Sequence, residues 1–546
     1  MKASDLFVIA LEEEGVKYIF GVAGEENLDL LESLRTSSIQ FIPTRHEQAA
    51  GFMAATVGRL TGKAGVALST LGPGATNLVT SVAYAQLGAM PAVFITGQKP
   101  ITKSRQGAFQ IINTNDLFLP ITKYTKQIKH ANGAASIVRE AFRRADEERP
   151  GAAHIELPED IAAQDTEGKV FPVTEVRRPL PEKKAIDRAV AMIHEARRPL
   201  ILIGAGANRK RTARTLTKLI EKTGIPFFTT QMGKGVVDEH HPQYLGTAAL
   251  SSGDYLHCAI DRADLIINFG HDIVEKPPYI PENGRHRVIH VNFGTAQVDD
   301  IYAPDLEVIG DIANAAWQLY EQVEPQSHWD FSSMFRVKDA LEKEIAKDAA
   351  RTDFPMIPQR IVKETGDGVE KDGVIALDNG MYKIWFARNH KVSFPNTLLL
   401  DNALASMGAG LPSAIAAKLL HPEKQVVAVA GDGGLMMSIQ ELETAVRLKL
   451  NLTVVVLNDN GFGMIKWKQE AEGFTDFGLT FDNPDFLTLA ESFGAKGHRV
   501  TEPGQLADLL KLAHREGGVH LIEVPIDYSE NDRVLTKGLA AMICPE

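Results

Sequence analysis

The chain has 546 residues, which is enough for three or four domains and excludes a single small binding module. Its hydrophobic share of 44% is ordinary for a globular protein and argues against intrinsic disorder. The 58 basic and 70 acidic side chains leave a net charge of −12, and a surface that repels phosphate on average argues against nucleic acid as a partner.

Two features bear on location. Cys258 and Cys544 are too few for a disulfide framework, so we expect them to be unpaired in a reducing, cytoplasmic environment. The apolar run 6–11 ends at three successive glutamates. It is too short for the core of a signal peptide or for a membrane span, so we expect neither.

The first part of the chain alternates helix-like and strand-like patterns. Helices are expected over 4–14 and from about His46, and strands at 18–20, 39–43, 65–69, 92–96 and 154–157. Repeated alternation of this kind predicts a parallel sheet with helices on both faces. The stretch 164–184 is rich in Glu, Pro and Arg without helical periodicity, and we interpret it as a linker.

Two further α/β segments follow, separated by a polar connector at 323–329. The expected strands are 200–203, 226–228, 265–267 and 288–291 in the second segment, and 374–378, 425–430, 452–457 and 520–524 in the third. We therefore predict an α/β fold of three domains, 1–165, 185–322 and 355–546, each a doubly wound, mainly parallel sheet. The first and third segments have a similar alternation of expected helices and strands, although no exact internal repeat is present.

The most informative stretch is a glycine turn after a strand. Residues 426–434 end in Gly431-Asp432-Gly433-Gly434, and the next strand, 452–457, ends in Asn458-Asp459-Asn460-Gly461. In a right-handed βαβ unit the second strand returns parallel to the first, so Asp432 and Asp459 are expected at the same sheet edge. Two carboxylates there can hold one hard cation, and the bare glycine amides favour an anion. This combination predicts magnesium with a diphosphate ligand.

Each of these turns also has a local explanation. Gly-Asp-Gly and Asn-Asp-Asn-Gly sequences form turns without any ligand, because their residues favour turn conformations. Their pairing across one βαβ unit favours the binding site over two unrelated turns.

Glu47 has two interpretations. As the third helical residue after an N-cap Thr44, it would complete a capping box at the start of an Ala-rich helix. As a carboxylate it could instead be a catalytic group. The local pattern alone favours the cap, so the catalytic interpretation depends on the rest of the chain.

Two more glycine turns follow strands. The turn 72–77, Gly-Pro-Gly-Ala-Thr-Asn, opens a helix and is either a plain turn or a point where the backbone approaches a ligand. Gly204-Ala205-Gly206 is placed as a dinucleotide fingerprint would be, but Arg209 stands at the third glycine position, so the signal is weak. The sixteen histidines contain no HExxH pairing and no GxSxG occurs, which argues against a histidine zinc site and a serine hydrolase.

Together, Arg45-His46-Glu47, the 72–77 turn and the paired turns at Asp432 and Asp459 resemble the thiamine-diphosphate enzymes related to acetolactate synthase, over nearly the whole chain. The finer segments 378–388, 441–449 and 525–529 look like the catabolic, pyruvate-specific branch of that family. The resemblance implies an N-terminal pyrimidine-binding domain, a central domain and a C-terminal diphosphate- and metal-binding domain. It also implies a homodimer or homotetramer with active sites between the first domain of one subunit and the third of another.

The resemblance assigns roles to individual residues. Asp432, Asp459 and the Gly461 carbonyl would hold magnesium, while Met407 would wedge thiamine diphosphate into its bent form and the Ala405 carbonyl would accept a hydrogen bond from the aminopyrimidine. Glu47 would bond the pyrimidine ring nitrogen and promote activation of the cofactor. The implied cofactor-binding residues are Glu47, Gly380, Ala405, Met407, Asp432, Gly433, Gly434, Asp459, Gly461 and Met464.

Gln110 and Lys123 complete the catalytic set, because they lie in segments that resemble the lining of the family's substrate channel. A lysine suits the carboxylate of pyruvate as a point charge. Lys126 and Lys129 follow closely, however, and all three could instead form one exposed face. The implied reaction decarboxylates one pyruvate and transfers the two-carbon unit to a second, which gives 2-acetolactate and carbon dioxide.

Two departures from the biosynthetic branch stand out. Met381 and Tyr382 follow Gly380 where that branch has Gln-His, so diphosphate contacts there are expected from the backbone. The segment 271–275, His-Asp-Ile-Val-Glu, replaces an Arg-Phe-Asp-Asp flavin segment, so we expect no flavin. The alternatives are another thiamine-diphosphate decarboxylase or carboligase, a biosynthetic catalytic subunit, or a nucleotide-binding regulatory protein that uses Gly204 and Gly206.

Overall fold

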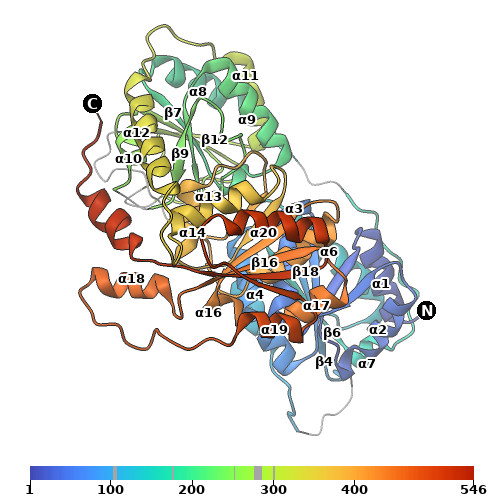
Figure 1. Cartoon of the computed structure of the whole chain (residues 1–546). Coiled ribbons are helices and arrows are strands. Elements are labelled where there is room, and N and C mark those ends of the chain that lie inside the picture. Colours follow the sequence, from blue (N-terminus) through green and yellow to red (C-terminus); the bar gives the residue numbers. More distant parts are fainter. Residues whose placement is uncertain are drawn as a thin grey trace. The chain divides into compact units, whose positions relative to one another are not determined.

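The structure is a computed structural model that describes residues 1–102, 107–174, 178–250, 253–272, 274–275, 286–298 and 302–545. Its named strands form three six-stranded sheets in which every pairing is parallel. Helices lie along the sheets, as Figure 1 shows. The predicted fold class, three doubly wound parallel α/β sheets, is confirmed.

The chain divides into two compact units. Unit 1 contains residues 1–177, 403–422 and 438–450, and unit 2 contains 178–402, 423–437 and 451–546. The first sheet belongs to unit 1, and the central and third sheets belong to unit 2.

The first sheet has the strand order β2-β1-β3-β4-β6-β5. Its strands are β1 (Tyr18–Gly21), β2 (Gln40–Pro43), β3 (Gly65–Ser69), β4 (Ala92–Gln98), β5 (Tyr124–Gln127) and β6 (Ala152–Pro158). Helices α1 (Ala3–Glu13), α2 (Leu28–Arg35) and α6 (Ala134–Asp146) share one apolar core with Ile19 and Val66. Strand residues alternate between faces, so Phe94 points the other way and meets α3 (Glu47–Thr61).

The third sheet repeats this topology. Its order is β14-β13-β15-β16-β18-β17, with β13 (Val374–Leu377), β14 (Leu398–Leu399), β15 (Val426–Gly431), β16 (Leu452–Asn458), β17 (Lys496–Arg499) and β18 (Val519–Pro525). The strands of the two sheets follow one another in the same order, which explains why the first and third segments have a similar alternation of expected helices and strands. In both sheets the chain first adds strands on one side of the starting strand and then on the other, so the strand order reverses between β1 and β3 and between β13 and β15. Ligands of open α/β sheets bind at such a point, beyond the carboxyl ends of the strands.

The central sheet has the order β12-β11-β10-β7-β8-β9, which is the strand order of dinucleotide-binding folds. Its strands are β7 (Pro199–Ile203), β8 (Phe227–Thr230), β9 (Tyr244–Ala248), β10 (Leu265–Phe269), β11 (Arg287–Asn292) and β12 (Leu306–Ile309). Ile201 and Ile203 pack with α8 (Lys183–Glu195), α9 (Lys210–Thr223) and α11 (Ile312–Gln322), while Leu200 and Leu202 pack with α10 (Tyr255–Ile260) and α12 (Ser332–Ala349).

The strands missed by the sequence analysis are β5, β9, β12, β14 and β17, and each lies at the edge of its sheet. Edge strands have one neighbour instead of two, so they need less apolar sequence: β5 (YTKQ) and β17 (KGHR) are mostly polar, and β14 is only two residues long. Helix α12, which follows the predicted polar connector, was also missed. Of the helices that the structure describes, none is both long enough and apolar enough to span a membrane.

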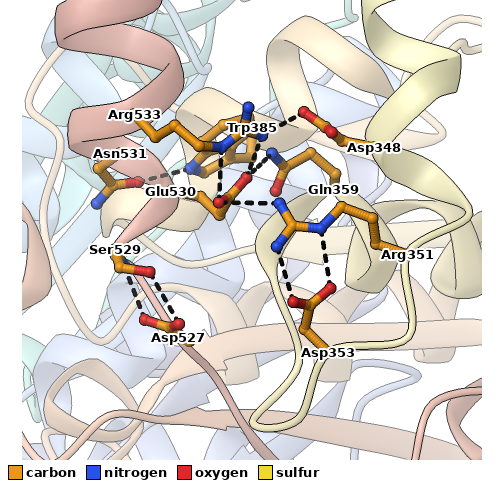
Figure 2. Close-up of polar contacts among 10 residues, drawn as sticks. All are labelled: Asp348, Arg351, Asp353, Gln359, Trp385, Asp527, Ser529, Glu530, Asn531 and Arg533. Atoms are coloured by element: carbon orange, nitrogen blue, oxygen red, sulfur yellow. Dashed lines mark hydrogen bonds and ion pairs between the residues drawn. The ribbon is translucent and has the colours of Figure 1, made fainter.

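The C-terminal segment is anchored by a polar network (Figure 2). Glu530 accepts hydrogen bonds from Gln359 (2.7 Å) and Arg533 (2.8 Å), and it pairs with Arg351 at 3.0 Å. The indole N–H of Trp385 donates to Asn531 at 2.8 Å. These contacts, together with a π-helix at Asn531–Gly538, fix the chain after the last strand.

Our prediction that the two cysteines are unpaired was wrong. Cys258 on α10 forms a disulfide with Cys544, with their Cα atoms 5.6 Å apart. The two residues are 286 positions apart, and only the fold of unit 2 brings them together. Met542 packs on the apolar core beside Cys258, and Arg262 donates to the Pro545 carbonyl, so the disulfide lies within a docked segment.

Candidate active site

Glu47 is the first residue of α3, directly after the turn that follows β2 in unit 1. Its side chain is 8% exposed and accepts a hydrogen bond from the Asn77 amide at 3.0 Å. Asn77 belongs to α4 (Gly72–Leu87), the helix after β3. The carboxylate therefore lies near the direction reversal of the first sheet, where a ligand site is expected.

The predicted capping box at this helix is wrong. The N-cap is His46, whose Nδ1 accepts the backbone N–H of Gln48, and Glu47 is the first rather than the third helical residue. Thr44 donates to the His46 carbonyl instead of capping the helix. The carboxylate of Glu47 therefore takes no part in the cap, and its contribution to the helix is limited to that of an acidic residue in the first turn.

The turn before α3 is held by Glu441, a residue to which the sequence analysis gave no role. Its fully buried carboxylate accepts the backbone N–H groups of Arg45 (3.0 Å) and His46 (3.1 Å), and burial raises its pKa. Glu441 begins α17 (Glu441–Arg447), and Arg447 donates to the Pro43 carbonyl on the same turn.

Residues 72–77, which the sequence predicted as a turn before a helix, are the first residues of α4 and lie against both Glu47 and Gln110. Gly72 has φ +39°, and a Cβ there would lie 2.4 Å from the Gln110 carbonyl oxygen, so only glycine fits. A Cβ on Gly74 would lie 3.2 Å from a carboxylate oxygen of Glu47. Gln110 is exposed with φ +57°, an uncommon conformation for a residue with a side chain. The structure thus brings these two predicted residues to one turn.

Ala405 and Met407 also belong to unit 1, in the segment before α15 (Gly410–Leu420). Ala405 has φ +55° and is exposed, and Met407 is half-buried. Helix α15 packs on α3, where Thr56 donates to Ser413 at 2.9 Å. A non-glycine residue held in a left-handed conformation is a form of backbone strain that is frequent at ligand sites.

Lys123 lies elsewhere. It precedes β5, so it is at the amino edge of the first sheet, whereas Glu47 lies beyond a carboxyl edge. Its ammonium donates to the carbonyl oxygens of Glu147 (2.5 Å) and Arg149 (2.7 Å), and burial lowers its pKa to about 8. This geometry gives Lys123 a structural role and adds no support to its predicted contact with pyruvate.

In unit 2, Asp432 and Asp459 follow the adjacent strands β15 and β16, as predicted from the βαβ pattern. Asp432 is 1% exposed and accepts the N–H groups of Gly433 (2.7 Å) and Gly461 (3.3 Å) and the Asn483 amide (2.8 Å). Burial raises the pKa of Asp432. Burial and then the charge of Asp432 raise the pKa of Asp459 to about 7.

These residues fit a magnesium ion. The two carboxylates repel one another at the end of one sheet, and a divalent cation would remove that repulsion. Together with the predicted Gly461 carbonyl they would supply the hard oxygen donors that magnesium prefers. Asn483, which the sequence analysis missed, orients Asp432 through its amide group.

The residues around Asp432 fit a diphosphate. A Cβ on Gly434 would lie 2.7 Å from the Asp378 carboxylate, and one on Gly433 would lie 2.7 Å from the Phe462 ring, so the turn stays bare. The ring of Tyr382 packs against Gly380. Its buried hydroxyl lies near Gly431, yet it makes no well-formed hydrogen bond within the described part of the chain. A ligand oxygen would satisfy that group.

Met464 lies two residues into α18 (Gly463–Ala471), the helix that directly follows the Asp459 turn. It is half-buried. Gly463, at the start of the helix, comes close to Asp459, since a Cβ there would lie 3.0 Å from its carboxylate. The structure therefore places Met464 beside the predicted metal turn within unit 2.

The Gly204 turn of the central sheet does not fit a dinucleotide. Every backbone N–H group from Gly204 to Arg209 already donates within the chain, and that of Ala205 goes to the carboxylate of Glu275 at 3.1 Å. Glu275 is buried, which raises its pKa to about 7, and it also accepts the N–H of Met232. A pyrophosphate would find a carboxylate in place of free donors.

The glycines of this turn have a packing explanation. A Cβ on Gly204 would lie 2.6 Å from the Gly270 carbonyl oxygen, and Gly270, with φ +71°, passes against Ala207. The two backbones after β7 and β10 therefore approach closely without a ligand between them. Ile273, in the middle of the predicted flavin-replacing segment, lies outside the described residues.

Comparison with known proteins agrees with this arrangement. Three models of thiamine pyrophosphate enzymes match the chain: the N-terminal TPP-binding domain at residues 1–117, the central domain at 186–319 and the C-terminal TPP-binding domain at 378–524. The chain is therefore a member of the thiamine pyrophosphate enzymes.

Individual relatives place the chain more closely. It is 33% identical to "Acetolactate synthase" of Bacillus subtilis and to "Acetolactate synthase, catabolic" of Raoultella terrigena, with 97% of this chain aligned to 94% and 95% of theirs. It is 32% identical to "Probable acetolactate synthase large subunit" of Methanocaldococcus jannaschii, over 97% of this chain and 93% of that protein. The chain belongs to the acetolactate synthase family.

Proposed function

We propose that the protein is an acetolactate synthase of the catabolic, flavin-independent type, which joins two molecules of pyruvate into 2-acetolactate with release of carbon dioxide. The observation that carries the proposal is Glu47, a buried carboxylate outside the helix cap, bonded to Asn77 and fixed by the turn that Glu441 holds. Bound thiamine diphosphate supplies the carbanion chemistry that such a decarboxylation and transfer needs.

The chain's own residues bind and orient in this proposal. Glu47 holds a proton at the pyrimidine ring nitrogen, and Met407 and Ala405 shape the pyrimidine side of the site. Asp432, Asp459 and the Gly461 carbonyl hold magnesium, while Gly380, Gly433, Gly434 and Met464 surround the diphosphate. Gln110, beside the 72–77 turn, faces the substrate. Assembly as a homodimer or homotetramer completes the sites.

The proposal includes the absence of flavin. Its support is the Gly204 turn, whose amides are used by the chain itself and by the Glu275 carboxylate. Joining two pyruvates requires no net oxidation or reduction, so the reaction has no need of an electron carrier.

Incubation with pyruvate, thiamine diphosphate and Mg²⁺, followed by NMR of the products, tests the function. The proposal predicts one 2-acetolactate and one carbon dioxide for each two pyruvates consumed, by protein whose denatured visible spectrum has no flavin band. Acetaldehyde as the main product would indicate a decarboxylase instead, and activity that depends on added flavin would indicate the biosynthetic branch.

A further inference from the structure

A polar pocket of about 570 Å³ lies at the carboxyl ends of β4, β6 and β5 in unit 1. It is distinct from the Glu47 site, because Glu47 follows β2 at the other side of the same sheet. The lining residues are Gln98, Ile111, Ile112, Asn113, Asn115, Asp116, Lys126, Gln127, Lys129 and Glu156. Its volume suits a small organic ligand.

The floor of the pocket contains a buried carboxylate with neutral partners. Glu156 is 1% exposed and accepts from the amides of Gln98 (3.0 Å) and Gln127 and from the hydroxyl of Thr114. Among the described residues, no lysine, arginine or histidine forms an ion pair with it. A buried carboxylate gains from a positive charge close by, and a cationic ligand group could supply one here.

The third sheet contains the same arrangement with the charge balanced. Glu523 is the fifth residue of β18, as Glu156 is of β6, and each lies opposite the fourth residue of the edge strand. In β17 that residue is Arg499, which donates to Glu523 at 2.7 Å. In β5 it is Gln127. The repeat thus has a guanidinium group where the first sheet has a shorter, neutral side chain and a pocket.

The other charged side chains of the pocket indicate which further groups a ligand would need. Asp116 adds a second carboxylate, and Lys126 and Lys129 add two ammonium groups at exposed positions. A ligand with a cationic end for Glu156, an ammonium for Asp116 and a carboxylate for the lysines would match all four. We propose that this pocket binds a small basic amino acid, with its guanidinium or ammonium side chain toward Glu156. Ile111 and Ile112 of the lining directly follow Gln110, so the pocket adjoins that residue, but the proposal does not rest on the proposed reaction.

Calorimetric titration of the full-length protein with L-arginine tests the proposal. We expect one molecule bound per chain, and no binding of L-norvaline, which has the same backbone and carbon chain without the guanidinium. Glu156→Gln should abolish binding. No heat with L-arginine, or equal binding of L-norvaline, would overturn the proposal.

A second variant keeps the test independent of the stability of Glu156 substitutions. Gln127→Arg places a guanidinium beside Glu156, as Arg499 lies beside Glu523, and should weaken L-arginine binding at least tenfold while the protein stays folded by circular dichroism. Gln40→Arg adds the same charge at the exposed opposite edge of the sheet and should bind normally. Undiminished binding by Gln127→Arg would contradict the assignment.

Discussion

The carboxylate of Glu441 accepts the backbone N–H of His46 at 3.1 Å, although 395 positions separate the two residues in the chain. His46 is the N-cap of the helix that begins with Glu47. Since Glu441 also accepts the N–H of Arg45, it fixes the turn that directs Glu47 without touching Glu47 itself. Glu441 is therefore a positioning residue for the proposed site.

Replacing Glu441 should disturb both the fold and the site. Glu441→Ala leaves two N–H groups without an acceptor, so the free energy of unfolding should fall by about 2–3 kcal/mol. Displacement of Glu47 should lower kcat by about tenfold. Glu441→Gln, whose carboxamide oxygen still accepts, should restore most of both. Chemical denaturation and steady-state kinetics measure the two effects, and Glu13→Ala, at an exposed position of α1, is the control.

A full loss of activity in Glu441→Gln would contradict this positioning role, because the acceptor oxygen is retained. So would normal kinetics in Glu441→Ala.

The sequence predicted the central strands and the pairing of Asp432 with Asp459, because both depend on strong local patterns repeated along the chain. Of the edge strands it predicted only β2. Contacts such as Glu441 with His46, or Cys258 with Cys544, could not be predicted, because long separations in the chain leave no local signal. The capping error at Thr44 arose because Thr44 and His46, two positions apart, could each begin the helix.

The paired carboxylates predict a pH dependence of stability. The pKa of Asp459 is raised to about 7, above the value of about 3.9 in an unfolded chain, so the native state binds the extra proton between these values. Its contribution to stability is therefore greatest at low pH and is lost as pH rises through 7. In EDTA, raising the pH from 5.5 to 8 should lower the free energy of unfolding of the wild type relative to that of Asp459→Asn.

Magnesium with thiamine diphosphate should reverse that trend, since a ligating carboxylate must be deprotonated. Thermal unfolding across pH measures both cases, and Asp476→Asn, at an exposed position, is the control. An identical pH profile for wild type and Asp459→Asn, with and without magnesium, would show that Asp459 is no metal ligand.

The Tyr382 hydroxyl predicts a contact that the sequence analysis assigned to the backbone alone. Tyr382→Phe removes a buried hydroxyl without a well-formed partner, so the cofactor-free protein should keep its stability. Loss of a hydrogen bond to the diphosphate should weaken thiamine-diphosphate binding by about five- to tenfold. Calorimetry measures the affinity, with Tyr320→Phe in the central domain as control. Unchanged affinity would leave the hydroxyl without this role.

The disulfide predicts redox-dependent stability. Cross-linking Cys258 to Cys544 restricts the unfolded chain, and such bonds typically contribute about 2–4 kcal/mol. Dithiothreitol should therefore lower the melting temperature of the wild type and leave Cys544→Ser unchanged. Two alkylated cysteines, detected by mass spectrometry in protein isolated in the presence of an alkylating agent, would contradict the disulfide and favour our expectation of a reducing cytoplasmic environment.

The central claim is that Glu47 drives acetolactate formation from pyruvate, and the direct measurement compares Glu47→Gln with wild type. With saturating thiamine diphosphate and magnesium, and binding verified by calorimetry, the rate of 2-acetolactate formation should fall by about 10² or more, the scale of acid–base participation. The unfolding midpoint should hardly change, because Glu47 does not cap its helix. Near-normal turnover in Glu47→Gln, or no 2-acetolactate from the wild type, would contradict the account.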